Sequence, residues 1–375
     1  MGRETKNNFR DDNDSTRRKR GKYGFSRKRK QRMYGALDLG TNNCRLLIAR
    51  PTGQGFRVVA SFSRIVRLGE GLAKSGRLAE IAMDRTISAL AICSEKLKSF
   101  DVVQSRNIAT EACRRADNCD EFLARIDEET GLGFEAITSN EEARLALKGC
   151  QSLLHPEQPY AVVFDIGGGS TEIIWAKKNN PEDSADFEIL DVLSLPLGVV
   201  TLAEECGIYE INNECYQNMV SDISSKLPAF CERNDIKSKV ANNQVQMLGT
   251  SGTVTTLGAV HLDLSHYDRS QIDGLDLTFD ELNHASRKLT DLDFKGRTEM
   301  PCIGNERAEL VIPGCAILEA ICRAWPVGRL RVADRGLREG MLLELMIKDG
   351  VPVIGNPAAN CRQHQNSRQN SGTVG

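Results

Sequence analysis

The sequence predicts an α/β protein built from two similar halves that face a common cleft. Residues 37–49 and 164–176 align over thirteen positions without a gap, and each stretch places an aspartate, Asp38 or Asp165, between apolar residues just before a glycine-rich turn. Strand-like and helix-like segments alternate in both halves. A length of 375 residues also suits two domains better than one. The repeat therefore predicts two folded halves that each present a carboxylate and a ring of turn amides.

The first half begins at Met33 with a strand, a turn and a second strand, and a third strand completes an antiparallel meander. Apolar residues at helical spacing follow, and Gly131 is a typical helix terminator. We expect strands at 34–38, 44–49, 56–62 and 107–110, and helices at 79–100 and 119–130.

The second half repeats the strand–turn–strand pattern and adds more helix. We expect strands at 159–165, 171–176, 187–194, 245–248 and 329–332, and helices at 141–152, 199–205, 213–234, 254–260, 309–325 and from 334 through 346. The last helix is expected to return to the first domain as a hinge. The predicted domains are therefore residues 33–139 with about 333–349, and residues 140–332.

The two ends differ in composition from the rest of the chain. Residues 16–32 hold ten Lys or Arg and no acid, so the remaining residues carry a net charge of −12. With so little apolar bulk, residues 1–32 are predicted to be a disordered basic tail that contacts polyanions, or else a solvated extension without a partner. Residues 350–375 are rich in Asn, Gln, Ser and Gly and predict a second disordered tail.

The glycine-rich turns suit the binding of a phosphate group. Their residues adopt positive φ easily or offer backbone N–H groups at close range, which together make an anion seat. Because Asp38 and Asp165 would repel a phosphate, a divalent cation is expected between them, Mg²⁺ or alternatively Mn²⁺. Ordinary hairpins are the alternative, and the ungapped repeat disfavours it. The candidate binding residues are Gly40, Thr41, Asn42 and Asn43 in the first turn, and Gly167, Gly168, Gly169, Ser170 and Thr171 in the second.

A third turn follows the strand-like residues 245–248 and leads into a helix. A helix N-terminus reached through a Gly-rich turn attracts anions, although the segment is also consistent with a simple strand-to-helix connection. No dinucleotide fingerprint or Walker A sequence is present. The candidate residues here are Gly249, Thr250, Ser251 and Gly252.

Two charged segments are expected to approach the cleft. Arg114 follows a strand, and its guanidinium suits bidentate contact with phosphate oxygens. Asn140 is expected to cap a helix whose first turn holds Glu141 and Glu142, and acids at this place are also ordinary complements of the helix dipole. Further candidate cations for an anionic chain are Arg45, Arg64, Arg67, Arg297 and Arg307.

Composition indicates a cytoplasmic protein without a membrane partner. Hydrophobic content is 40% and charged content 27%, and no apolar run approaches the ~20 residues that span a bilayer. The N-terminus lacks the apolar core of a signal peptide. The twelve cysteines and five histidines show no zinc-binding spacing, which makes a metal centre of that kind unexpected.

Five motifs taken in order resemble the exopolyphosphatase and guanosine pentaphosphate phosphohydrolase (Ppx/GppA) family of the actin, hexokinase and heat-shock-70 superfamily. They are ALDLGTNNCRLLIA, ATEACRRA, NEEARLALKG, VFDIGGGSTEII and LGTSGT. The agreement covers about residues 33–348 and is similar to the short form of the family, without the helical HD-type domain of larger members. The resemblance implies two ribonuclease-H-like domains around a central cleft and Mg²⁺-dependent removal of a terminal phosphoryl group.

The resemblance also implies roles for individual residues. Glu142 takes the place of the catalytic glutamate and Arg114 that of the phosphate-binding arginine. The metal-linked carboxylates fall on Asp38, Asp165 and Glu172. The sequence therefore favours a phosphoanhydride hydrolase in which Glu142 activates water and Arg114 offsets charge on the phosphoryl oxygens.

The substrate stays open between two polyanions. Inorganic polyphosphate is favoured, and guanosine pentaphosphate is the alternative. An ATP-switched binding protein of the actin or heat-shock-70 kind is a further alternative that shares the turns and carboxylates. Symmetric dimerisation is consistent with the sequence, which gives no measure of it.

Overall fold

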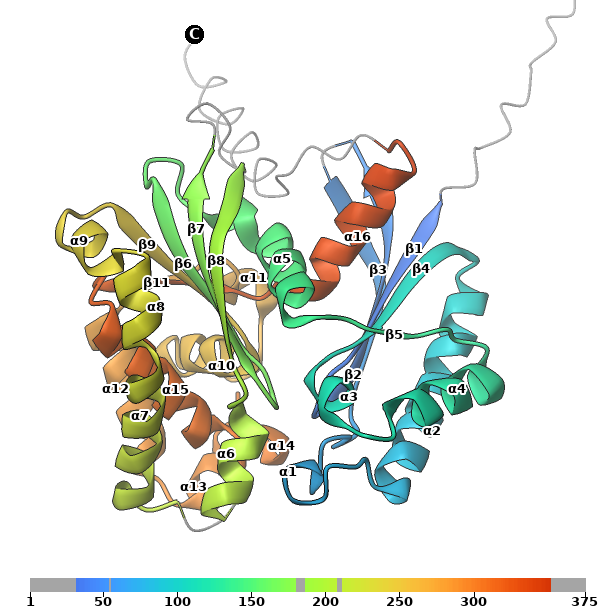
Figure 1. The fold of residues 1–375 in the computed structure, drawn as a ribbon, viewed down its shortest axis with the longest axis horizontal. Coiled ribbons are helices and arrows are strands. Elements are labelled where there is room, and N and C mark those ends of the chain that lie inside the picture. Colours follow the sequence, from blue (N-terminus) through green and yellow to red (C-terminus); the bar gives the residue numbers. More distant parts are fainter. Residues whose placement is uncertain (1–31, 54, 180–185, 208–210, 352–375) are drawn as a thin grey trace, which may run out of the picture. The chain divides into compact units, whose positions relative to one another are not determined.

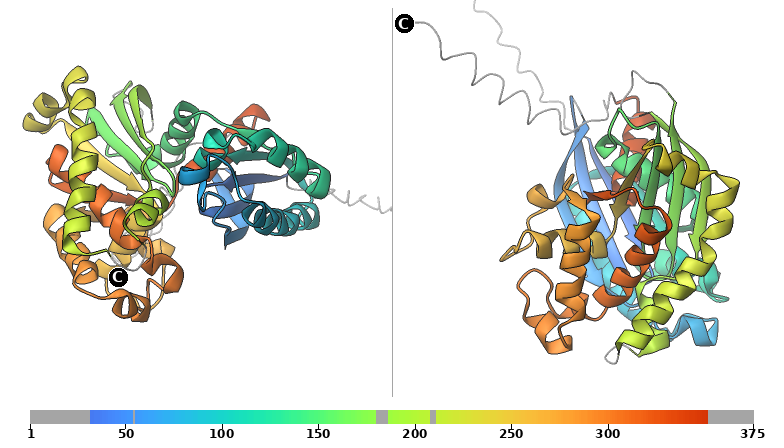
Figure 2. Two further views of the ribbon diagram at one scale, coloured as in Figure 1. Left: turned by 60° about the horizontal axis from the view of Figure 1, so that its bottom comes forward. Right: turned by 90° about the vertical axis from the view of Figure 1, so that its left-hand side faces the viewer.

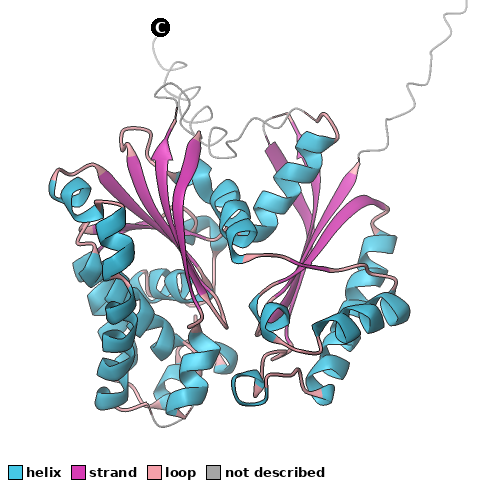
Figure 3. Cartoon of the chain, in the orientation of Figure 1, coloured by secondary structure: helices cyan, strands magenta, loops and turns pink. Residues whose placement is uncertain are grey.

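Two mixed β-sheets carry the chain, one in each half of the sequence (Figures 1 and 3). The computed structural model describes residues 32–53, 55–179, 186–207 and 211–351. The predicted tails therefore lie outside the described residues, apart from Arg32, Gly350 and Val351. Sheet A has the order β3-β2-β1-β4-β5, from β1 (Met33–Leu39), β2 (Asn43–Thr52), β3 (Gly55–Ile65), β4 (Val102–Ala109) and β5 (Glu135–Ala136).

Sheet B repeats this plan and adds one strand. Its order is β10-β11-β9-β6-β7-β8. In both sheets the first strand pairs antiparallel with the second and parallel with the fourth, so β1, β2, β3 and β4 correspond to β6, β7, β8 and β9. The strands are β6 (Tyr160–Ile166), β7 (Thr171–Lys178), β8 (Phe187–Leu195), β9 (Val245–Thr250), β10 (Asp276–Thr278) and β11 (Arg329–Ala333).

Each sheet is covered on both faces, as alternation along its first strand predicts. Leu37 and Leu39 of β1 pack with α2 (Glu80–Ser99) and α4 (Cys119–Thr130), whereas Tyr34 and Ala36 pack with α16 (Leu337–Lys348). In sheet B, Phe164 belongs to the core shared with α7 (Asn213–Lys226), α10 (Gly252–His261), α12 (Phe279–Thr290) and α15 (Val311–Ala324). Figure 2 shows these helices together on one side of the sheet. The opposite face packs against α5 (Ser139–Cys150).

The remaining helices are short and lie in the connections. The predicted helix at 213–234 is divided, because Pro228 starts a separate helix. The predicted helix at 309–325 begins instead at Val311. The short helices are α1 (Leu72–Ser75), α3 (Glu111–Arg115), α6 (Val199–Cys206), α8 (Pro228–Arg233), α9 (Ile236–Ala241), α11 (Arg269–Ile272), α13 (Phe294–Glu299) and α14 (Asn305–Ala308), with a 3₁₀ turn at Gln151–Leu153.

Helices α5 and α16 cross closely where the two halves meet. A Cβ on Gly149 would stand 1.8 Å from the carbonyl oxygen of Gly336, and one on Gly340 would stand 2.1 Å from that of Leu145. Only glycine permits this approach. Helix α16 packs on β1 while α5 packs on β7, so the crossing joins the two sheets. The division into domains at 139/140 stays a prediction.

None of the helices in the described ranges has the length and apolar character needed to cross a bilayer.

Candidate active site

The two aspartates occupy equivalent places at the ends of their strands. Asp38 on β1 lies opposite Arg45 on β2, and Asp165 on β6 lies opposite Glu172 on β7. Both hairpins therefore present a carboxylate one pair of residues before the turn. The partner on the returning strand is a cation in the first half and an acid in the second.

The two turns are closed by the same backbone hydrogen bond. Gly40 N–H donates to the carbonyl oxygen of Asn43 over 2.9 Å, and Gly167 N–H donates to that of Ser170 over 2.9 Å. The expectation of two matched hairpins is confirmed by this geometry and by the antiparallel pairing of their strands.

The turns also lie against each other. A Cβ on Gly168 would be 3.3 Å from the Cβ atoms of Thr41 and Asn42, and one on Gly169 would be 2.5 Å from Thr41 Oγ1. Glycine is therefore needed in the second turn for close approach rather than for a positive φ. The structure brings the two Gly-rich turns to one place between the sheets.

Arg114 is held among three glutamates. Its Nη1 donates to Glu142 Oε2 over 2.6 Å, its Nη2 donates to Glu111 Oε2 over 2.8 Å, and Nη2 lies 3.8 Å from Glu172 Oε1. Glu172 is almost fully buried and also accepts a hydrogen bond from Ser194 Oγ over 3.0 Å. The arginine thus brings together residues from α3, α5 and β7.

Burial and mutual repulsion make these carboxylates easy to protonate. Burial, with the nearby Glu172 carboxylate, raises the pKa of Glu142 to about 8. Burial and Glu142 raise the pKa of Asp165 to about 7, and burial and Asp165 raise the pKa of Glu172 to about 7. Burial also raises the pKa of Asp38, against the attraction of Arg338 and Arg45. A cluster perturbed in this way is typical of a functional site.

Adjacent glutamates on α5 have separate roles. Glu141 accepts hydrogen bonds from Arg144 and Arg106 on the outer side, while Glu142 is buried beside Arg114. The helix begins at Ser139, and the Thr138 side chain caps it by accepting from Glu141 N–H, so the expected cap at Asn140 is wrong. Residue Glu141 therefore fits the ordinary helix-dipole interpretation, and Glu142 does not.

The third turn stands where the Arg114 segment stands in the first half, since both follow the strand parallel to the aspartate strand. Ser251 caps α10, its Oγ accepting from Val254 N–H over 3.1 Å. Gly249 lies against the Phe164 ring, where a Cβ would be 2.6 Å from the ring. Thr171 Oγ1 donates to the carbonyl oxygen of Leu197 over 2.8 Å. Gly249 and Thr171 thus contribute to packing rather than to the cavity surface.

A cavity of about 880 Å³ collects most of the predicted site residues between the sheets. Arg114 and Glu172 lie behind its surface and are joined to it by their contact with each other and by Arg114's hydrogen bond to Glu142. Predicted residues that line the cavity are Asp38, Gly40, Thr41, Asn42, Asn43, Arg45, Glu142, Asp165, Gly167, Gly168, Gly169, Ser170, Thr250, Ser251 and Gly252.

Four guanidinium groups that line this cavity make no ion pair with another described residue. They belong to Arg45, Arg64, Arg307 and Arg338, and Arg45 and Arg338 repel each other. Arg338 was not predicted from the sequence as a site residue, and it lies in the first turn of α16. Another of the expected cations, Arg67, pairs instead with Glu309 over 2.8 Å.

The carboxylates provide oxygen ligands of the kind that Mg²⁺ and Mn²⁺ prefer. Across the described ranges, no three Asp, Glu, His or Cys side chains converge enough to hold a metal by themselves. Mg²⁺ commonly takes one or two carboxylates, several waters and substrate phosphate oxygens. The repulsion among Asp38, Asp165 and Glu172 is what such a cation would relieve, so the donor set fits it.

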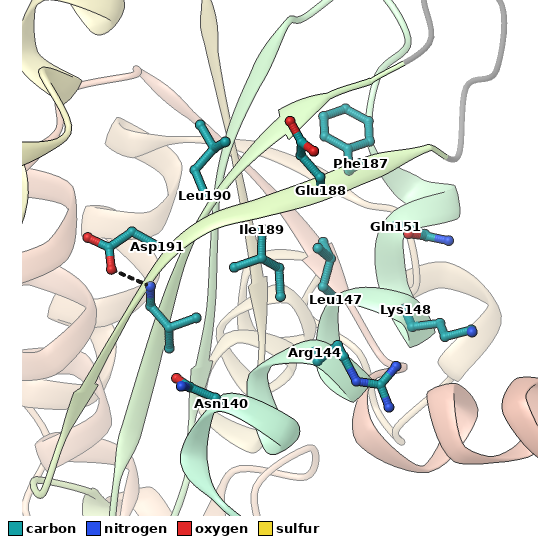
Figure 4. Close-up of a pocket in the computed structure, with 11 residues that line it drawn as sticks. Asn140, Arg144, Leu147, Lys148, Gln151, Phe187, Glu188, Ile189, Leu190 and Asp191 are labelled. Carbon is teal, nitrogen blue, oxygen red and sulfur yellow. Dashed lines mark hydrogen bonds between the residues drawn. The ribbon is translucent and has the colours of Figure 1, made fainter.

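Another cavity, of about 740 Å³, lies between α5 and the edge strand β8 (Figure 4). Its two cations are already compensated: Arg144 pairs with Glu141 and Glu344, and Lys148 lies 3.3 Å from a Glu344 oxygen. This cavity therefore has less attraction for a polyanion than the cleft.

Fold and site together define a two-lobed α/β protein of the actin-like, ribonuclease-H-like class with a charged cleft between its lobes. Residues 47–349 match the model of the Ppx/GppA phosphatase family, and the chain belongs to that family. Membership supports phosphoanhydride hydrolysis and indicates a phosphatase.

Solved structures agree with this assignment. A Ppx/GppA family member from Aquifex aeolicus is 27% identical with a TM-score of 0.70, and the match covers 86% of this chain and 99% of that chain. An exopolyphosphatase from Cytophaga hutchinsonii, 24% identical, shares the fold with a TM-score of 0.73 over 87% of this chain and 100% of that chain. The family resemblance and the fold class expected from the sequence are both confirmed.

Proposed function

We propose that this chain is an exopolyphosphatase that releases the terminal phosphate of inorganic polyphosphate. The observation that carries the proposal is the set of unpaired guanidinium groups beside the carboxylate cluster. Arg45 and Arg338 repel each other within one cavity, and a dense polyanion would neutralise both.

The aromatic residues of the cavity support polyphosphate over a guanosine polyphosphate. Arg64 stands over the Phe62 ring at 5.4 Å, and Arg307 stands over the Tyr267 ring at 5.1 Å. One face of each ring is therefore already occupied by a cation, which leaves less room for stacking a purine. Guanosine pentaphosphate remains the alternative substrate through the family resemblance.

In the proposed reaction, Glu142 takes a proton from the attacking water, and the water oxygen bonds to the terminal phosphorus. The bridging P–O bond breaks, and the shortened polyphosphate leaves with that bond's electron pair as an oxyanion. Burial and Glu172 raise the pKa of Glu142 to about 8, so its ionised carboxylate is a stronger base than that of an ordinary glutamate, and the ionised fraction grows as pH rises toward this value. Arg114, bonded to Glu142, orients this carboxylate and offsets charge on the phosphoryl oxygens.

The Gly-rich turns would hold the terminal phosphate through backbone N–H groups. The carboxylates proposed to hold Mg²⁺, with Mn²⁺ as the alternative, are Asp38, Asp165 and Glu172, of which one or two would bind the cation directly. The bound cation would supply charge neutralisation between these carboxylates and the phosphate.

Phosphate release from polyphosphate and from guanosine pentaphosphate, compared at equal concentration of terminal phosphate, tests the proposal. Polyphosphate should give the larger kcat/KM, and Arg338→Gln should raise its KM, whereas Arg57→Gln, at an exposed position on β3, should not. Faster release from guanosine pentaphosphate would establish the alternative. Tight ATP binding without hydrolysis of either substrate would favour a nucleotide-switched binding protein.

A further inference from the structure

A pocket of about 600 Å³ lies between α7, α12, α13 and α15, away from the cleft. It shares no lining residue with the cleft cavity. Arg297, which the sequence offered as a cation for the cleft, lines this pocket instead. The expected place of Arg297 in a polyphosphate channel is therefore wrong.

Arg297 is a buried cation without a countercharge. The residue is only 8% exposed. Its Nη1 donates to the carbonyl oxygen of Leu292 over 2.6 Å, and its buried Nε has no hydrogen-bond partner. No ion pair joins it to a carboxylate in the part of the chain that the structure describes. Burial lowers the pKa of Arg297, and the attraction of nearby Asp293 only partly offsets this effect. An uncompensated buried charge is costly, which indicates that an anion completes the site.

Asp291 and Glu319 line the same pocket and Asp293 lies near Arg297, and two of these three acids have other partners. Asp293 caps α13, its Oδ1 accepting from Gly296 N–H over 2.7 Å. Glu319 accepts a hydrogen bond from Tyr216 OH over 2.5 Å and pairs with Arg323. Neither acid therefore forms a direct bond with the Arg297 guanidinium.

The rest of the pocket wall is partly apolar. Ile312, Cys315 and Leu318 of α15 line it, and Leu282 of α12 faces the same space. Its volume falls within the roughly 300–1,000 Å³ typical of small-molecule sites. Such a wall accommodates the apolar body of a ligand whose charged head reaches Arg297.

We propose that this pocket binds a small organic oxyanion, with a carboxylate or phosphate head on the Arg297 guanidinium and an apolar body against α15. A planar guanidinium suits contact with the oxygens of one such head group. Carboxylate and phosphate share this chemistry, and the wall distinguishes an organic anion from a free inorganic one.

Calorimetric titration of the full chain with benzoate, phenyl phosphate, inorganic phosphate and benzyl alcohol tests the site. We expect benzoate or phenyl phosphate to bind, and the one with the higher affinity identifies the head group. Inorganic phosphate and benzyl alcohol should bind at least about tenfold more weakly. Arg297→Gln should lower the affinity for the organic anion at least about tenfold. Arg329→Gln, a matched change at an exposed position on β11, should leave this affinity unaltered.

Equal binding by wild type and Arg297→Gln would overturn the proposal, as would failure of both organic anions to bind at millimolar concentration. Should Arg297→Gln not fold, Ser286→Glu is the second variant, because Ser286 lines the pocket and an added carboxylate there would compete for the guanidinium. Ser286→Glu is expected to abolish binding, and undiminished binding would also overturn the proposal.

Discussion

Replacing Glu142 by glutamine separates its proposed role as a base from its role in packing. The amide oxygen of glutamine can still accept the bond that Arg114 Nη1 now donates over 2.6 Å, but the amide cannot take a proton from water. A positioned general base contributes roughly 10²- to 10⁴-fold, which corresponds to about 2.7–5.5 kcal/mol of activation free energy. We therefore expect kcat to fall at least ~10²-fold while KM changes only a few-fold.

Phosphate release from polyphosphate in the presence of Mg²⁺ measures this effect. Glu141→Gln is the matched control, since Glu141 is the preceding residue and its carboxylate pairs with Arg106 and Arg144 outside the cleft. The control should retain wild-type kcat. Hydrolysis by Glu142→Gln at a near wild-type rate would refute the assignment of the base.

Three further predictions concern the metal, the helix crossing and pH. Asp38→Ala and Asp165→Ala should each abolish Mg²⁺-dependent phosphate release, and undiminished release from both would contradict the paired-hairpin site. Gly149→Ala should lower the free energy of unfolding by about 1–3 kcal/mol in urea titration, because its Cβ would meet a carbonyl oxygen at 1.8 Å, whereas Gly133→Ala has open space and should not. Hydrogen bonds from Arg144 lower the pKa values of Glu141 and Glu344, so these pairs stabilise the fold fully above the ordinary glutamate pKa and are lost as pH falls through the lowered values. Arg144→Gln should therefore cost more stability at pH 7 than at pH 3.

The paired hairpins could be predicted from sequence because their information is local. An aspartate between apolar residues and a glycine-rich turn specify a strand end and a turn without reference to the rest of the chain. The structure confirms the hairpins and closes both turns with the same hydrogen bond. Local capping signals could also have predicted the unassigned helix α12, because Thr278 and Glu281 form a capping box at its start.

The cations could not be placed in the same way, since their roles depend on tertiary contacts. Arg67, Arg297 and Arg338 look alike in sequence, yet Arg67 pairs with Glu309, Arg297 lines a separate pocket, and Arg338 lines the cleft. An arginine has a long side chain and no turn signal, so only packing decides where its guanidinium lies. The charged residues at the start of α16 could be recognised in the sequence, but their position over the cleft depends on the close crossing of α16 with α5, which glycines permit.

The duplicated hairpins differ in charge at one equivalent position, and this difference makes one side of the cleft more negative than the other. Opposite Asp38 stands Arg45, which attracts the carboxylate without forming an ion pair, whereas opposite Asp165 stands Glu172, which adds negative charge to the second hairpin. Glu142 faces this second hairpin, and its pKa is raised by burial and by Glu172. Water activation and cation binding are therefore expected on the Asp165 side, and the anionic chain is expected to extend toward Arg45, where repulsion is smallest.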